Sequence, residues 1–252
     1  MSKVVDDRIV ERRQLVRRER RRDRLHRTIA VLVVLAIAVG LLLAERSPLV
    51  AISDVEVVGV SEVDADSVIA ASGIRPGTSL LRVDLDEAAA SVAELPRIES
   101  AQVVRTDPLT VEISVVERQP AYVARVDDDT ITIDDDGIVL SPGAPAGLVV
   151  IEVENGALPE PGESVNAVPA LANALAVVEG MPGPLGPRIA GMRAIEEDRA
   201  VIVLDDGTAV EMGRAQQLDA KARALAIVLE DLDGRVVQVI DVRAPAAPVV
   251  TG

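Results

Sequence analysis

The sequence predicts an α+β protein with a single N-terminal transmembrane helix and two folded parts of different character after it. Three observations support this. An uncharged apolar stretch follows an arginine-rich leader, and patterns in the order β-α-α-β-β fill the region up to Pro120. From Ala121 onward, short strand patterns alternate with acidic turns and lead to one long amphipathic helix pattern.

The apolar stretch Thr28–Ala44 holds 17 uncharged residues, which as a helix span about 26 Å, the short end of a bilayer crossing. Residues 1–27 carry Lys3 and ten arginines against five acidic residues, a net charge of +6. An excess of Lys and Arg on one flank marks the cytoplasmic side. We therefore expect a single-pass protein with a cytoplasmic tail at 1–27, a transmembrane helix at 28–44, and the rest of the chain outside.

A cleaved signal peptide is the alternative interpretation of this stretch. Signal peptides usually have an apolar region of 7–15 residues that ends in a small-x-small site. This run is longer, and it ends in Leu42-Leu43-Ala44. The sequence therefore favours an uncleaved anchor, with a basic tail that contacts anionic lipid of the inner membrane rather than nucleic acid.

The region after the leader is strongly acidic. Residues 28–252 have a net charge of −21, so this part should repel phosphates, and we expect no nucleic-acid partner. Cysteine is absent, which excludes disulfides and thiol chemistry. Tyr122 is the only aromatic residue, so the core has to consist of Val, Ile, Leu and Ala.

The first folded part shows, in order along the chain, one strand pattern, two helix patterns and two further strand patterns. Gly73 follows the first helix, Asp84 is a plausible N-cap of the second, and Pro96 ends it. The expected elements are a strand at Ile52–Val58, helices at Asp64–Ser72 and Leu85–Leu95, and strands at Ile98–Arg105 and Leu109–Glu117.

The second folded part is a mixed, β-rich domain. Its expected strands are Ala121–Val126, Thr130–Ile133, Ile138–Leu140, Leu148–Val153, Val201–Leu204, Ala209–Met212 and Val236–Val242. The expected helices are Val168–Glu179 and Ala215–Leu232, the latter with apolar residues three or four apart.

The residues needed for common catalytic and metal sites are missing. His26 is the only histidine and precedes the predicted membrane helix, so it cannot join a Ser–His pair or a zinc site in the outer part. The acidic runs Asp127–Asp129 and Asp134–Asp136 lack the spacing of a calcium-binding loop and are expected to be solvated turns. A pair of carboxylates could serve a glycosidase, but only Tyr122 could stack on a sugar. We expect no enzyme activity, no cofactor, no metal and no small-molecule substrate.

The order and spacing of several short stretches resemble the FtsQ/DivIB family of bacterial cell-division proteins. In the first part these are Ile52–Gly59, Gly77–Leu80, Leu95–Ala101, Pro108 and Val116–Pro120; in the second they are Asp134–Gly137, Leu204–Gly207, Met212-Gly213, Lys221 and Ile240–Arg243. The resemblance implies a POTRA domain at 45–119, an FtsQ-type β domain at 120–243 and a C-terminal tail at 244–252.

The same resemblance implies a non-enzymatic divisome scaffold at the septum that supports septal wall synthesis. Its partners would be small bitopic proteins of the FtsB/DivIC type, together with FtsL. The second domain would bind by strand addition, in which main-chain hydrogen bonds supply affinity. The implied partner-binding residues are Ile240, Asp241, Val242, Arg243, Ala244 and Ala246, with Arg243 placed to pair with a partner carboxylate. The simpler alternative is an internal strand followed by a solvated Arg243.

The sequence departs from the family where the docking strand should continue. Pro245 and Pro248 each remove a backbone donor, so a regular ladder on both sides past Ala244 is excluded. We expect either a short docking edge or an extended tail that orders on binding. A POTRA-bearing export or assembly factor, and an anchored cell-wall enzyme, stay open as alternative functions.

Overall fold

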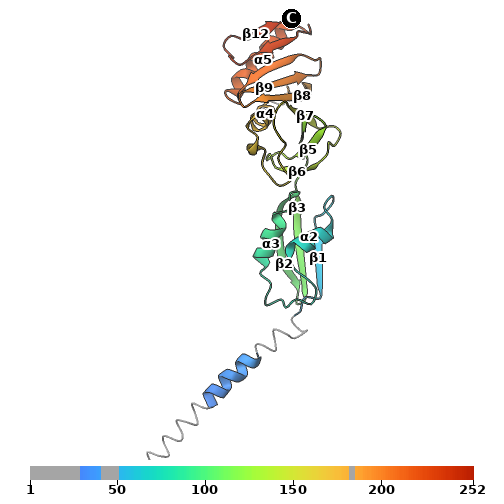
Figure 1. Ribbon diagram of the computed structural model, residues 1–252, viewed down its shortest axis with the longest axis vertical. Helices are drawn as coiled ribbons and strands as arrows, with labels where there is room; N and C mark the ends of the chain where they lie inside the picture. The colour runs from blue at the N-terminus through green and yellow to red at the C-terminus, as the bar shows by residue number, and fades with distance from the viewer. Residues whose placement is uncertain (1–28, 41–50, 182–184) are drawn as a thin grey trace, which may run out of the picture. The chain divides into compact units, whose positions relative to one another are not determined.

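The computed structural model describes residues 29–40, 51–181 and 185–252 (Figure 1). The predicted cytoplasmic tail and the ends of the predicted membrane segment lie outside these ranges. Residues 29–40 are helical with exposed side chains. Within the described ranges, no helix is both long and apolar enough to cross a membrane. Of the predicted transmembrane helix at 28–44, these ranges include only residues 29–40.

The first folded unit has the predicted β-α-α-β-β order. Its elements are β1 (Asp54–Val58), α2 (Ala65–Ser72), α3 (Leu85–Ala93), β2 (Ile98–Asp107) and β3 (Thr110–Glu117). The three strands form one sheet in the order β1-β3-β2, so the last strand in sequence lies in the middle. Buried Val111, Ile113 and Val115 alternate along β3 with more exposed residues, as expected of a sheet covered on one face.

Local sequence explains where α2 ends and which face of α3 is buried. Gly73 follows α2 with a φ of 68°, a left-handed conformation that glycine adopts at no steric cost. In α3, Ala88 and Val92 are one helical turn apart and are buried, so they form the face that packs inward.

Glu117, the last residue of β3, holds the loop that leads into α2. Its carboxylate accepts hydrogen bonds from the backbone N–H groups of Ser61 at 2.8 Å and Val63 at 2.8 Å, and from that of Glu62 at 3.1 Å. The Ser61 hydroxyl donates a further bond at 2.7 Å. A single acidic side chain therefore fixes three consecutive residues of the loop.

The second unit is built on one nine-stranded sheet with two main helices. The strand order is β12-β11-β10-β9-β8-β7-β4-β5-β6. Its strands are β4 (Tyr122–Val126), β5 (Asp129–Ile133), β6 (Val139–Pro142), β7 (Val149–Val153), β8 (Ile189–Glu196), β9 (Arg199–Leu204), β10 (Ala209–Gly213), β11 (Val239–Asp241) and β12 (Val249–Thr251). The helices are α4 (Pro169–Glu179) and α5 (Leu218–Leu232), and short 3₁₀ turns cover Val165–Ala167 and Gly186–Arg188.

The sheet is mixed, with parallel pairs β4–β7, β7–β8 and β10–β11 and antiparallel pairs elsewhere. A row of directly paired residues crosses it and forms the centre of the core. These are Ala124, Ile151, Met192, Ile202, Val210 and Ile240, all at most 2% exposed. They share one cluster with apolar residues of α4 and α5, so both helices pack on this face. The core is aliphatic, with methionine in addition, as the lack of aromatic residues requires.

Together the two units confirm the predicted α+β class, with the differences confined to particular elements. The predicted strands of the second unit all exist, within a few residues. The sequence did not predict β8 or β12. Residues 249–251, which the prediction assigned to a tail, pair with β11 and belong to the sheet.

Candidate partner-binding edge

One end of the nine-stranded sheet is formed by β12. This strand pairs with β11 through Val239↔Thr251, Ile240↔Val250 and Asp241↔Val249, and no other strand of the described residues pairs with it. All three of its residues are exposed, Val249 at 56% and Val250 at 42%. An exposed edge strand offers unpaired backbone groups to another chain.

The turn before β12 explains how the two prolines fit. Ala247 donates its backbone N–H to the carbonyl of Ala244 at 3.0 Å, which reverses the chain after β11. Pro245 lies within this turn, and Pro248 immediately precedes β12. Neither proline therefore occupies a ladder position, and the short strand after them keeps its backbone donors.

The predicted partner-binding residues fall into two groups. Ile240 and Val242 are 0% exposed and contribute to the core, and β11 has a neighbour on each side. The backbone of β11 therefore cannot accept an added strand, and in this respect the simpler alternative of an internal strand is correct. Asp241 is partly exposed, and Arg243, Ala244 and Ala246 are exposed before and within the turn.

Arg243 is not simply a solvated charge, because it binds Asp241. Its Nε lies 3.0 Å from Oδ1 and 3.1 Å from Oδ2 of Asp241, and its Nη2 lies 2.6 Å from Oδ2. The backbone N–H of Arg243 also donates to Oδ1 at 3.0 Å. Hydrogen bonds from the Arg243 side chain lower the pKa of Asp241 despite its partial burial. Bidentate pairs of this kind are geometrically well defined.

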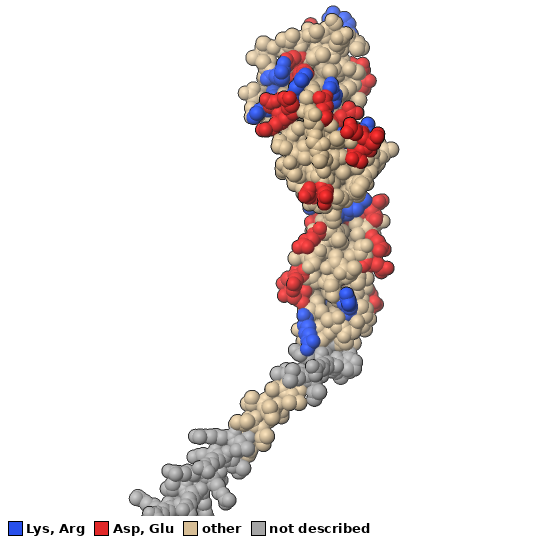
Figure 2. Space-filling view, in the orientation of Figure 1, with Lys and Arg blue, Asp and Glu red and all other residues tan. Residues whose placement is uncertain are grey.

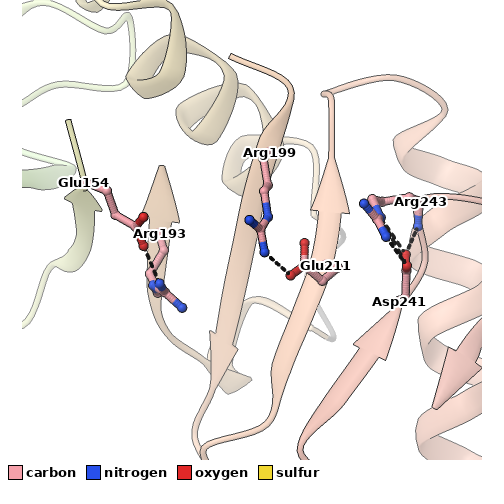
Figure 3. A network of polar contacts seen from close by, with 6 residues as sticks. All are labelled: Glu154, Arg193, Arg199, Glu211, Asp241 and Arg243. Atoms are coloured by element: carbon pink, nitrogen blue, oxygen red, sulfur yellow. Dashed lines mark hydrogen bonds and ion pairs between the residues drawn. The ribbon is translucent and has the colours of Figure 1, made fainter. Parts of the chain in front are cut away.

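The Asp241–Arg243 pair is one of three pairs of oppositely charged side chains on the sheet face opposite the helices (Figure 3). Arg193 binds Glu154, and Arg199 Nη2 binds Glu211 Oε1 at 3.2 Å. The parallel register of β10 and β11 places Glu211 directly beside Asp241. The second oxygen of Glu211, Oε2, is buried and has no hydrogen-bond partner in the described residues. Acidic and basic side chains also lie close together over the visible part of this unit (Figure 2).

Gly213, at the end of β10, lies directly against the stem of Arg243. A Cβ built on Gly213 would be 3.0 Å from Cγ and 3.3 Å from Cδ of Arg243, closer than the stem would tolerate without shifting. Gly213 also has a φ of 69°, in the left-handed region. Only glycine leaves both the backbone and the arginine undisturbed here.

Two side chains fix the backbone around Gly213. Asn173 of α4 donates from Nδ2 to the Gly213 carbonyl at 2.9 Å and accepts from the N–H of Ala215 at 2.7 Å. Lys221 of α5 donates from Nζ to the carbonyls of Met212 and Arg214, each at 2.8 Å. Burial lowers the pKa of this lysine. The segment under Arg243 is therefore tied to both helices.

Only part of this arrangement has a signal in the sequence. Met212-Gly213 and Lys221 stand out as family-like stretches, but nothing in the sequence indicates that they support Arg243. Glu211 and Asn173 carry no sequence signal, because their roles depend on strand register and on the packing of α4.

The acidic run Asp134–Asp136 is the one group of described residues whose carboxylates could approach a common metal ion. Asp134 is 1% exposed, and its oxygens accept from Arg118 Nη1 at 2.6 Å and from the backbone N–H of Ile138 at 2.7 Å. These contacts are those of a capped turn, as predicted. Asp134 is nevertheless buried and paired with Arg118, so the expectation of a solvated turn is wrong for this residue.

Comparison with known proteins agrees with the two-unit organisation. The family model for the FtsQ-type POTRA domain matches residues 50–118, and the model for the C-terminal part of the cell division protein FtsQ/DivIB matches residues 121–243.

Several curated relatives are named cell division protein FtsQ. The chain is 34% identical to that of Mycolicibacterium smegmatis over 201 residues, 79% of this chain and 58% of the relative. It is 30% identical to that of Corynebacterium glutamicum over 203 residues, 80% of this chain and 88% of the relative. It is 31% identical to that of Mycobacterium tuberculosis H37Rv over 222 residues, 87% of this chain and 66% of the relative. The chain thus spans little more than half the length of the M. smegmatis protein.

Among solved structures, the extracytoplasmic domain of DivIB from Geobacillus stearothermophilus aligns with a TM-score of 0.32 and 16% identity. The alignment covers 48% of this chain and 98% of that domain. A similarity this low supports no argument about the present fold.

Proposed function

Because the chain belongs to the FtsQ/DivIB family of bacterial cell division proteins, we propose that it is a non-enzymatic scaffold of the divisome that acts at the septum. Its partners in this proposal are a small bitopic protein of the FtsB/DivIC type and an FtsL-type protein, and the assembly supports septal wall synthesis. The observation that carries the proposal is the exposed edge of β12.

The proposed binding mode is strand addition at β12. The partner contributes an extended segment whose backbone pairs with the open edge, and Arg243, next to the turn, pairs with a partner carboxylate. Val249 and Val250 are both exposed, and as neighbours in a strand their apolar side chains point to opposite faces of the sheet. The predicted residues Ile240 and Val242 support this surface from the core, whereas Asp241, Arg243, Ala244 and Ala246 lie at its end.

Membrane anchoring through residues 28–44 completes the proposal. The uncharged run and the net charge of +6 before it favour a single-pass protein with the N-terminus in the cytoplasm. In this orientation both folded units face the envelope, where bitopic division proteins expose their own outer segments.

Paired proline substitutions test strand addition directly. Successive backbone N–H groups of a strand point to opposite edges, so of Val249 and Val250 one donates toward β11 and the other toward the open side. We expect the proline at the outward N–H to abolish co-purification of the FtsB/DivIC-type protein without changing thermal unfolding. The other proline should weaken the β11–β12 pairing itself.

Threonine at the same two positions is the matched control, because it keeps the N–H group and the branched Cβ. Both threonine variants should bind as the parent protein does. Partner binding that survives both prolines would refute strand addition at β12. Hydrolysis of peptidoglycan by the purified protein would refute the non-enzymatic role.

A further inference from the structure

The guanidinium of Arg243 is held from one side only. The Asp241 carboxylate accepts hydrogen bonds from Nε and Nη2. Nη1 forms no hydrogen bond or ion pair among the described residues. A guanidinium can bind a second carboxylate across its Nη1–Nη2 edge while the first stays in place. The Arg243 side chain is 57% exposed, so that edge can be reached from solvent.

The stem of Arg243 is held as well as its head group. It lies against Gly213, whose missing Cβ leaves the necessary space. Gly213 is in turn fixed by Asn173, and the carbonyls on either side of it accept from Lys221. A long side chain normally loses conformational entropy when it binds a partner. Because these contacts already restrict Arg243 in the free protein, less entropy is lost on binding.

The position of Arg243 suits a strand added beside β12. Arg243 directly precedes the turn that leads into β12, two residues after the Asp241↔Val249 pair. Neighbouring strands are about 4.8 Å apart, so an added strand would lie about 10 Å from the line of β11. An arginine and an acidic side chain together can bridge that distance over the open face of the sheet.

The neighbouring charges indicate that the Asp241–Arg243 pair persists when a partner binds. Glu211 lies directly beside Asp241, and among the described residues Arg199 alone forms an ion pair with Glu211. Release of Arg243 would leave two adjacent carboxylates with a single guanidinium, which is unfavourable for like charges directly opposite one another. We therefore expect Asp241 to keep its bonds to Arg243 and to orient it, and not to compete with the partner carboxylate for the guanidinium.

We propose that Asp241 and Gly213 are positioning residues for partner binding, and that they present the Nη1–Nη2 edge of Arg243 to an Asp or Glu side chain of the strand added at β12. This inference rests on the proposed function. The pairing of Arg243 with a partner carboxylate belongs to the proposed function, and the inference adds the two residues that orient Arg243 for that pairing.

The first test is a double-mutant cycle on the full-length protein in detergent. The probe is the fluorescently labelled extracytoplasmic segment of the FtsB/DivIC-type protein of the same organism, and the readout is its Kd by anisotropy. Asp241→Asn should weaken binding about three- to tenfold, because Arg243 must then be ordered during binding. Arg243→Gln should weaken it at least as much, and Asp241→Asn should add nothing in the Arg243→Gln background.

The second test uses two glycines that share a left-handed backbone. Gly213 has a φ of 69° and Gly207 a φ of 86°, but a Cβ on Gly207 would meet nothing within 4 Å. Both alanine variants strain the backbone, and only Gly213→Ala pushes the stem of Arg243. We expect Gly213→Ala to weaken probe binding several-fold and to lose this effect in the Arg243→Gln background, while Gly207→Ala binds as the parent does.

The outcomes separate this inference from the proposed function. Unchanged or tighter binding by Asp241→Asn, or equal binding by Gly213→Ala and Gly207→Ala, would overturn the positioning role while leaving strand addition intact. Failure of the parent protein to bind the probe, or binding that survives both β12 prolines, would overturn the proposed function and this inference with it.

Discussion

The carboxylate of Glu117 accepts hydrogen bonds from the backbone of a loop that precedes it in the sequence by more than 50 residues. Burial alone would raise its pKa, but the hydrogen bonds from Ser61, Glu62 and Val63 outweigh this effect and lower the pKa from 4.5 to about 2. A carboxyl group with a lowered pKa stabilises the fold above its unfolded pKa, and the stabilisation is lost as the pH falls toward the folded value. The sequence shows Glu117 only as part of a family-like stretch.

Replacement of Glu117 by glutamine should therefore reduce stability in a pH-dependent manner. At pH 7 we expect a loss of up to about 3 kcal/mol, because a shift of this size corresponds to that free energy and an amide accepts fewer bonds. The difference from the parent protein should shrink as the pH falls from 4.5 toward 2. Urea unfolding at several pH values measures it.

Glu99→Gln, at an exposed position of β2, is the control for the loss of one negative charge. It should change stability by no more than a few tenths of a kcal/mol. A Glu117→Gln variant whose destabilisation is the same at pH 7 and pH 3 would show that the charge of Glu117 is not the source of its effect.

Individual elements were predictable where one local pattern was sufficient. The helices α2, α3 and α4 follow from apolar spacing together with Gly73, Pro96 and the proline at the start of α4. In contrast, β8 has no clean alternation, because the register shifts at Ile189/Gly191 and at Ala194/Glu196. Each bulge moves the inward-facing residues by one position, and the period of two disappears from the sequence.

The end of the second unit shows another limit. The prolines at 245 and 248 predicted either a short docking edge or an extended tail that orders on binding, and in the structure they lie in and next to a turn. A strand of three residues is too short to leave a periodic signal. What makes β12 a strand is its pairing with β11, and that is a property of the neighbouring strand rather than of its own sequence.

Gly59, at the end of β1, allows a prediction at the level of the element. A Cβ on Gly59 would lie 2.1 Å from the carbonyl oxygen of Val115 in β3, whereas a Cβ on Gly77 would meet nothing within 4 Å. Both glycines have a φ of 89°. We expect Gly77→Ala to cost about 1–2 kcal/mol from backbone strain alone, and Gly59→Ala to cost clearly more because β1 must separate from β3.

Hydrogen exchange measures this difference locally. Gly59→Ala should increase exchange throughout the three-stranded sheet, and Gly77→Ala only around the turn at residue 77. Equal protection of the sheet in the two variants would contradict the close approach of Gly59 to β3.

At the scale of the whole molecule, the nine-stranded sheet depends on pairings between distant segments. β4 pairs with β7 and β10 with β11, each in parallel and each across a long connection. The core row from Ala124 to Ile240 and the charged set on the opposite face both result from this register. A composition rich in Val, Ile and Ala is compatible with many strand orders, so the order could not be derived from the pattern of residues.

The orientation of the chain in the membrane is a prediction at the same scale. A fusion of alkaline phosphatase after Gly252 should be active in cells, and a fusion of green fluorescent protein at that site should be dark when exported by the Sec route. Deletion of residues 28–44 should reverse both results, because the apolar run is the proposed anchor. A fluorescent fusion of the intact chain, with inactive phosphatase, would contradict the proposed topology.

The sequence by itself determined the fold class, the order of elements in the first unit, the aliphatic nature of the core and the membership in a cell-division family. These follow from local periodicity, composition and the spacing of short stretches. Only the tertiary structure decided that β12 forms the open edge, that β11 is internal, and that Asp241 and Gly213 hold Arg243. The physical reason is that such contacts arise from strand register, which brings together residues whose separation in sequence carries no periodic signal.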